Sequence, residues 1–253
     1  MGEVCSTNKK IEWGGFAMKI AGLQKMTLLD YPGKVACTVF LQGCNFRCPF
    51  CHNSDLLPGQ GEFLMDDAEL LAFLEKRKGL LDGVCVTGGE PTLQPQLLQL
   101  LKSIKELGYA VKLDTNGARP QVLRELVEAG VVDYVAMDIK NSREEYPKTA
   151  GIGESLLPHI EESIRYLVSG KVDYEFRTTV AHPLHSAQSI EAMGKWVSSL
   201  NDGVQPKRWY LQLYVERESV LAGGLLAPSK ENMGQYCRIL SPYAEIISLR
   251  GVD

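Results

Sequence analysis

The feature that most constrains the fold is a regular alternation of short apolar runs with longer segments of helical period. From residue 35 onward, the runs are rich in Val, Ile, Tyr and Phe and have the length of strands. We expect strands over residues 35–41, 83–87, 110–114, 132–139, 172–180 and 209–214, and a short last strand over 244–249. Strands that are joined by a helix-length connection pair in parallel through right-handed crossovers. The alternation therefore predicts an α/β architecture.

Helix start and stop signals punctuate the segments between these runs. Asp66 followed by Glu69 makes a capping box at the start of one helix. Gly108 ends the next helix, and the one after it begins near Pro120 and stops at Gly130. The helix that ends at Gly108 covers 97–107, and further helices are expected over 155–168, 186–200 and 230–240. Because six strand–helix units are fewer than the eight of a closed barrel, we expect a partial (β/α)6 barrel of mostly parallel strands with outer helices. Ligands of such folds bind at the carboxyl ends of the strands.

Composition is ordinary for a globular protein. The chain has 253 residues, of which 45% are hydrophobic and 23% are charged, and no stretch approaches the roughly 18 unbroken apolar residues of a membrane span. We expect a loosely ordered extension over residues 1–17 and a single domain over 18–253. The extension lacks the apolar run of a signal peptide, so a cytoplasmic protein without a membrane partner is expected. A net charge of −4 argues against nucleic acid as a partner.

Three of the seven cysteines lie in one short loop after the first predicted strand. Cys44, Cys48 and Cys51 have the spacing Cys-x3-Cys-x2-Cys, and thiolates are suited to iron–sulfur clusters and zinc. A cubane cluster on three thiolates keeps one iron open for a substrate or cofactor. The alternative is a zinc site that adds His52 or a distant residue. Joint ligation by His52 and its neighbour Cys51 is strained, which favours the cluster.

The other cysteines call for a different explanation. Seven is an odd number, and the cysteines are too unevenly placed for a disulfide framework in a chain of this length. Cys37 and Cys85 lie in predicted strands and Cys237 in a predicted helix, where a buried cysteine behaves as a small hydrophobic residue. Cys5 lies in the N-terminal extension. We therefore expect one metal site rather than two.

Polar residues follow the second, third and fourth predicted strands. After the second, Gly88 and Gly89 let the backbone approach a ligand closely, and the Glu90 carboxylate can accept hydrogen bonds from an ammonium group. The alternative is a tight turn with an exposed carboxylate. Asp114 and Asp138 end the next two strands, and with Lys140 they make a polar cluster where a ligand pocket is expected. Alternatively, the aspartates cap turns and Lys140 is solvated.

Together, the cysteine spacing, the aromatic Phe50 before the last cysteine and the Gly-Gly-Glu sequence resemble the radical S-adenosylmethionine (SAM) superfamily. The resemblance implies a 4Fe-4S cluster on Cys44, Cys48 and Cys51, with SAM chelated to the open iron. Its amino end would be held by Gly88, Gly89 and Glu90. The reduced cluster would cleave SAM to methionine and a 5'-deoxyadenosyl radical, which abstracts a hydrogen atom. The cofactor carries the chemistry, and the protein orients it.

Further motifs resemble the activases of glycyl radical enzymes, most closely the anaerobic ribonucleoside-triphosphate reductase activating proteins. These motifs are Thr-Leu-Leu-Asp-Tyr-Pro-Gly over 27–33, Cys-His-Asn over 51–53, Asp-Thr-Asn-Gly over 114–117 and Met-Asp-Ile-Lys over 137–140. The resemblance implies that Asp114 and Asp138 flank the SAM carboxylate or a monovalent cation, with Lys140 beside them and Thr115 touching SAM. His182, after the fifth strand, is a further candidate contact. The implied partners are a glycyl radical enzyme as protein substrate and a flavodoxin or ferredoxin type electron donor.

Other functions stay open from the residues alone. One is the activase of another glycyl radical enzyme, such as pyruvate formate-lyase. A second keeps radical SAM chemistry but acts on a small molecule, such as the precursors handled by 7-carboxy-7-deazaguanine synthases. A third is a zinc-binding interaction module without catalysis. Iron content and reductive SAM cleavage distinguish the third from the first two.

Overall fold

The computed structural model describes residues 18–57 and 63–251. The predicted extension over 1–17, including Cys5, lies outside the described residues. The strands are β1 (Lys19–Thr27), β2 (Ala36–Leu41), β3 (Met65–Asp66), β4 (Gly83–Gly88), β5 (Ala110–Thr115), β6 (Tyr134–Asp138), β7 (Asp173–Val180), β8 (Arg208–Leu213) and β9 (Ile246–Arg250). The α-helices are α1 (Asp67–Glu75), α2 (Leu97–Glu106), α3 (Pro120–Glu128), α4 (Tyr146–Ala150), α5 (Leu157–Val168), α6 (Ala187–Ser199) and α7 (Lys230–Leu240).

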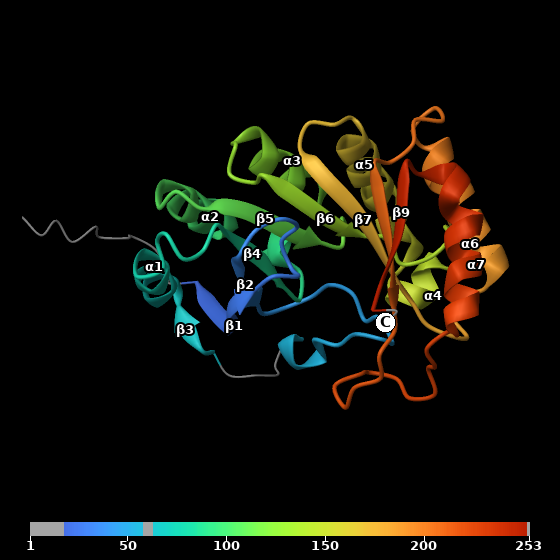
Figure 1. Cartoon of the computed structure of the whole chain (residues 1–253), viewed down its shortest axis with the longest axis horizontal. Helices are drawn as coiled ribbons and strands as arrows, with labels where there is room; N and C mark the ends of the chain where they lie inside the picture. The colour runs from blue at the N-terminus through green and yellow to red at the C-terminus, as the bar shows by residue number, and fades with distance from the viewer. Residues whose placement is uncertain (1–17, 58–62, 252–253) are drawn as a thin grey trace, which may run out of the picture.

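All strands form one nine-stranded sheet in the order β3-β1-β2-β4-β5-β6-β7-β8-β9. Every pair from β2 to β9 is parallel. In Figure 1 the strands fan from β3 at the left to β9 at the right, with α1 at one end of the sheet and α6 and α7 at the other. Within the described residues the two edge strands do not pair with each other. The predicted partial barrel of mostly parallel strands is therefore confirmed.

Strands β1 and β3 were not predicted from the sequence. They add an antiparallel edge beside β2. The side chains of β1 are largely exposed or half-buried, and only Ile20 and Thr27 are buried. Because one face of β1 is not covered by apolar neighbours, its sequence lacks the apolar alternation by which a strand is recognised.

The predicted helices are all present, with small shifts in their ends. The capping box of α1 forms as expected, with the Asp66 side chain accepting from the Glu69 backbone N–H and the Glu69 side chain accepting from that of Asp66. Pro120 occupies the first turn of α3. The short helix α4, between β6 and α5, was not predicted. No helix of the described chain is long and apolar enough to cross a membrane.

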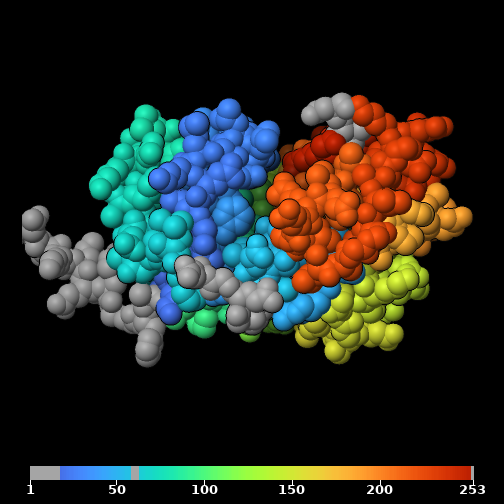
Figure 2. Space-filling model, turned by 90° about the horizontal axis from the view of Figure 1, so that it is seen from below, coloured from blue at the N-terminus to red at the C-terminus, as the bar shows by residue number. Residues whose placement is uncertain are grey.

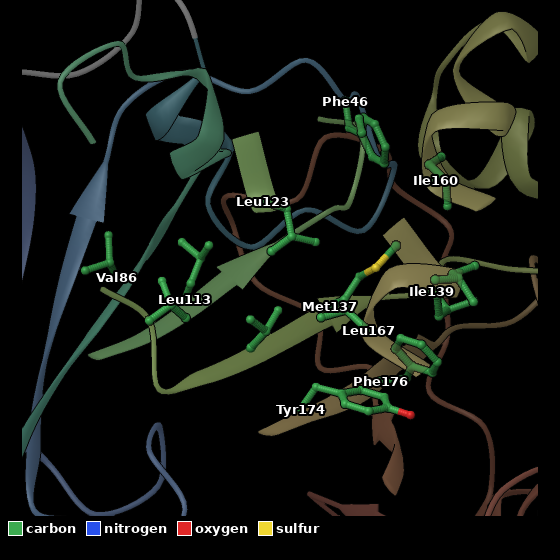
Figure 3. Packing of buried hydrophobic residues seen from close by; sticks show 14 of the residues in the cluster. Phe46, Val86, Leu113, Leu123, Met137, Ile139, Ile160, Leu167, Tyr174 and Phe176 are labelled. Carbon is green, nitrogen blue, oxygen red and sulfur yellow. The ribbon is translucent and has the colours of Figure 1, made fainter. Parts of the chain in front are cut away.

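The two faces of the central strands differ in polarity, since side chains alternate along a strand. Figure 3 shows the outer face, where Val86, Leu113, Met137 and Phe176 come from four successive strands. These residues belong to one buried core with side chains from the helices, which include Leu123, Ile160 and Leu167. The alternate positions on β5 and β7 carry charged side chains instead, which are Lys112, Asp114, Glu175 and Arg177. The polar inner face is where the site is built.

Candidate active site

The cysteine loop, residues 42–53, leaves the carboxyl end of β2 and lines a cavity of about 370 Å³. Cys44, Cys48 and Cys51 all contribute to the wall of this cavity. Phe46 and Phe50 are buried and anchor the loop in the apolar core. The Arg47 guanidinium donates to the carbonyl oxygens of Cys44 (2.8 Å) and Phe46 (2.7 Å). The structure thus brings the three predicted thiols to one cavity and holds their backbone in place.

Two of the three cysteine thiols lie in surroundings that favour their uncharged form. Burial raises the pKa of Cys44, and it raises that of Cys48 to about 12. Thiols in this state are protonated at neutral pH and must release protons when they bind a metal. Within the described residues, no three His, Cys, Asp or Glu side chains are placed to hold a single metal ion. The His52 Nε2 atom, a possible zinc ligand by sequence, lies 2.6 Å from the backbone oxygen of Val215.

A segment far away in the sequence holds the cysteine loop from outside. The Ser219 hydroxyl donates to the His52 carbonyl at 2.8 Å, and the Ser54 hydroxyl donates to the Ser219 carbonyl. The Ala222 N–H donates to the Pro49 carbonyl at 3.0 Å. In Figure 2 this orange segment after β8 lies beside the light blue cysteine loop. Sequence reasoning missed these contacts, because no local pattern links residues more than 160 positions apart.

Gly88 and Gly89 allow the end of β4 to lie directly against the start of the cysteine loop. The Gly89 N–H donates to Leu41 O at 2.9 Å, and the Glu90 N–H donates to Gly43 O at 2.7 Å. A Cβ atom at Gly88 would overlap the backbone of Leu41, and one at Gly89 would overlap that of Gly43. Gly88 also has φ of +123°, a conformation that favours glycine. Both glycines line the cavity, so this close approach brings bare backbone to the site.

Glu90 is 1% exposed, so the alternative of a turn with an exposed carboxylate is wrong. Its carboxylate accepts from the Thr92 N–H (3.1 Å) and hydroxyl, from the Thr115 hydroxyl (2.8 Å) and from the Asn116 N–H (2.7 Å). Burial raises the pKa of Glu90, and these hydrogen bonds oppose that shift. Glu90 therefore ties the ends of β4 and β5 together while it lines the cavity.

A charge network of Lys112, Asp114, Asp138, Lys140 and Arg177 spans β5 to β7 at the floor of the cavity. Arg177 donates from Nη1 to Asp114 Oδ2 (3.0 Å) and from Nε to Asp138 Oδ1 (3.1 Å). Lys140 Nζ donates to Asp138 Oδ2 at 2.9 Å, and Lys112 Nζ donates to Asp114 Oδ1. The alternative that Asp114 and Asp138 cap turns and Lys140 is solvated is therefore wrong.

The charges of this network stabilise one another. Burial alone would raise the pKa of Asp138, but Lys140 and Arg177 outweigh it and hold this pKa at about 2. Arg177 and Lys112 likewise outweigh burial at Asp114 and lower its pKa. Burial favours the neutral form of Lys140 and Arg177, and the neighbouring carboxylates reverse this and raise both pKa values. All five groups are charged at neutral pH, so three cations face two carboxylates.

Lys112 and Arg177 are site residues that sequence reasoning did not single out. Lys112 is 1% exposed, and Arg177 is half-buried with its guanidinium at the cavity wall. The available signal was a charged side chain at an inner-face position of an otherwise apolar strand, two residues before Asp114 in the case of Lys112. Such a position requires a buried partner of opposite charge.

The remaining sequence candidates fall into two groups. Thr115 is buried and lines the cavity. His182 is exposed and does not line the cavity. Its backbone pairs with that of Leu226. Cys37 is buried in the apolar core, as expected. Cys85 is also buried, but its thiol lies 3.7 Å from both Asp114 Oδ1 and Lys112 Nζ, and Cys237 is half-buried in α7.

Comparisons with known proteins agree with this architecture. The family model described as the radical SAM superfamily matches residues 38–197, more than half of the chain. A protein of Methanocaldococcus jannaschii, whose name describes it as a glycyl-radical enzyme activating enzyme, is 28% identical over 92% of this chain and 96% of its own length. The pyruvate formate-lyase-activating enzyme of Clostridium pasteurianum is 37% identical over 49% of this chain and 52% of its own.

Among solved structures, Streptococcus suis SuiB bound to S-adenosylmethionine superposes with a TM-score of 0.60. The match has 14% sequence identity and covers 82% of this chain and 48% of SuiB. At this identity the likeness concerns the fold alone.

Proposed function

The chain belongs to the radical SAM superfamily, and we propose that it is the activase of a glycyl radical enzyme, with anaerobic ribonucleoside-triphosphate reductase as its partner. The observation that carries the proposal is the similarity to the Methanocaldococcus jannaschii protein, which extends over nearly the whole of both chains. A similarity confined to the cluster-binding part would support the superfamily only. The particular reductase is proposed from the sequence motifs around the cysteine loop.

The residues of the cavity fit a 4Fe-4S cluster with SAM. Three thiols that share one cavity are a donor set of the soft type that iron–sulfur clusters use. Cys44, Cys48 and Cys51 would hold the cluster, which leaves one iron for SAM. The backbone of Gly88 and Gly89 and the buried Glu90 and Thr115 would form the wall beside the amino end of SAM.

The charge network suits the other end of the methionyl group. Its three cations exceed its two carboxylates by one positive charge. A carboxylate bound beside Lys140 and Arg177 would balance that charge, since both side chains line the cavity. When bound, the reduced cluster and SAM supply one electron and a hydrogen-atom abstraction, so that SAM yields methionine and 5'-deoxyadenosine and a glycine Cα loses one hydrogen atom.

The protein's own contribution is to position these groups. The chain after β4 is held by two hydrogen bonds, from Gly89 to Leu41 at the end of β2 and from Glu90 to Gly43 in the cysteine loop. Glu90 in turn is held by Thr115 and Asn116 at the end of β5. The wall of the site therefore depends on hydrogen bonds between neighbouring strand ends, which keeps the thiols and the SAM wall in one fixed relation.

The test is radical transfer to the partner. The anaerobically reconstituted protein, with SAM and a one-electron reductant, is incubated with anaerobic ribonucleoside-triphosphate reductase and examined by electron paramagnetic resonance. We expect an organic radical on the reductase that disappears when its radical-site glycine is replaced by alanine. The Cys51→Ser variant should give no radical, and the Cys237→Ser variant should behave as the wild type.

The outcomes separate the open functions. SAM cleavage without a radical on this reductase, but with one on another glycyl radical enzyme such as pyruvate formate-lyase, would reassign the partner. SAM cleavage without a radical on either protein would overturn the activase proposal and leave a small-molecule substrate. Stoichiometric zinc without iron would favour the non-catalytic module.

A further inference from the structure

The two aspartates of the charge network are already paired with cationic side chains. Each of the four carboxylate oxygens already accepts from a cationic donor: Asp114 from Lys112 and Arg177, and Asp138 from Arg177 and Lys140. The Arg177 guanidinium bridges the two aspartates through two different nitrogen atoms, at 3.0 and 3.1 Å. The space between the carboxylates is therefore filled by a side chain of the protein.

We propose that Arg177 takes the place of a bound monovalent cation between Asp114 and Asp138, so that SAM binding by this protein does not require such a cation. The resemblance to activases implied a monovalent cation at these aspartates, and the residues present do not fit it. A monovalent cation between the two carboxylates would lie beside Lys112, Arg177 and Lys140, whose positive charges already face all four oxygens and would repel it. Arg177 thus acts as a positioning residue, which fixes the two carboxylates and the neighbouring Lys140.

Displacing Arg177 from this place is unfavourable. Its side chain is 14% exposed, and the side chain of Asp114 is 13% exposed. A cation that entered between the aspartates would leave the guanidinium partly buried and without its two partners. A buried charge without a partner costs much more free energy than an unpaired charge in water. The planar guanidinium also matches two separate carboxylates in a way that a spherical ion does not.

Charge balance points in the same direction. With three cations and two carboxylates, the network already carries one excess positive charge. An added monovalent cation would raise this excess to two, whereas the carboxylate of SAM lowers it to zero. Within these five side chains, an added anion is therefore favoured over an added cation. The charge-balance argument rests on the proposed binding of SAM in this cavity, but it does not depend on which partner receives the radical.

The first experiment uses the wild-type protein in two salts of equal ionic strength, potassium chloride and tetramethylammonium chloride. Tetramethylammonium is too large to fit between two carboxylates. We expect the thermal midpoint of the SAM-free protein, and the calorimetric affinity of the reconstituted protein for SAM, to be the same in both salts. A midpoint or an affinity that is specifically higher in potassium chloride would overturn the proposal.

The second experiment creates the cation dependence that the wild type lacks. In Arg177→Met, two carboxylates lose their shared partner, so the thermal midpoint in tetramethylammonium chloride should fall by about 5 to 10 °C. Potassium should recover part of this fall, and the affinity for SAM should decrease about thirtyfold in tetramethylammonium chloride. Arg177→Lys should keep more of the affinity. The control Arg124→Met removes an arginine from an exposed ion pair with Glu162 and should show no difference between the salts.

A purely structural role of Arg177 would lower the midpoint equally in both salts, which would contradict the proposal. If Arg177→Met does not fold, the comparison of the wild-type protein in the two salts decides whether the proposal holds. The thermal midpoints are measured without SAM, so this result is valid even if the activase proposal is overturned.

Discussion

The cysteine loop and the charge network face the same cavity, but burial affects the charges of their side chains in opposite ways. Cys48 is buried and Cys44 half-buried, and desolvation raises the pKa of both thiols, which favours their uncharged form. In the network, opposite charges reverse the effect of burial, and the pKa of Asp138 falls to about 2. The cysteine loop would take part in the chemistry only with a metal cluster bound. The charge network is a set of paired ions with one excess positive charge.

This difference teaches how each region is built. The cysteine loop takes its three donors from eight consecutive residues, whereas the network draws on three strands. The two meet at Lys140, whose ammonium group lies 5.7 Å from the centre of the Phe50 ring. We therefore expect substitutions in the loop to abolish cofactor binding with little effect on folding, and substitutions in the network to lower stability.

The largest effect is expected from Cys44→Ser or Cys51→Ser. Each removes one of three soft donors, so iron binding and reductive SAM cleavage should be lost. Because both residues are only half-buried, the metal-free protein should lose no more than about 1 kcal/mol of unfolding free energy. Iron per chain, SAM cleavage products and urea unfolding measure the three quantities. Full iron content in either variant would contradict the ligand assignment, and Cys237→Ser serves as the control.

The next effect is expected from Lys112→Met in the charge network. It removes a 1% exposed ammonium group from Asp114 and should lower the unfolding free energy by about 3 kcal/mol. Lys105→Met is the matched control, because Lys105 pairs with Asp133 at the surface and should contribute less than about 1 kcal/mol. Urea unfolding of the metal-free variants gives both values. Equal losses of unfolding free energy in the two variants would show that the buried pair of Lys112 contributes no more to stability than a surface ion pair.

A pH series tests the balance of the network at Asp138. Its folded pKa of about 2 lies below the ordinary value of about 3.9, so its contribution is present above pH 4 and is lost as the pH falls towards 2. The contribution should be on the order of 2 kcal/mol. The stability gap between wild type and Asp138→Asn should therefore narrow from pH 5 to pH 2, as measured by urea unfolding. A constant gap would mean that Asp138 is not stabilised in its ionised form.

The smallest effect is expected from Ser219→Ala, which removes one hydrogen bond between the segment after β8 and the cysteine loop. The loss should be about 1 kcal/mol of unfolding free energy. Because the lost contact lies on the cysteine loop, iron should be removed faster by a chelator. Ser241→Ala, which removes a local bond to Arg238 O, should leave the rate of iron loss unchanged. The same rate in both variants would show that the segment after β8 does not restrain the loop.

Much of the molecule was predictable from local patterns in the sequence. Apolar periodicity located the parallel strands, and the capping box and helix-ending glycines located the helices, because these signals act over a few residues. Strand β1 escaped prediction because its exposed residues carry no such period. The cysteine spacing and the Gly-Gly-Glu sequence indicated the site for the same local reason.

The sequence by itself thus determined which donors lie together in the cysteine loop and at which strand ends a ligand binds. The tertiary structure alone decided that Arg177 bridges Asp114 and Asp138, that Glu90 is buried under hydrogen bonds from β5, and that Ser219 holds the cysteine loop. These pairings join residues 25 to 167 positions apart. The physical reason is that a buried charge or a loop takes its partner from whichever strand or segment packs beside it, and that neighbour is set by the folded sheet.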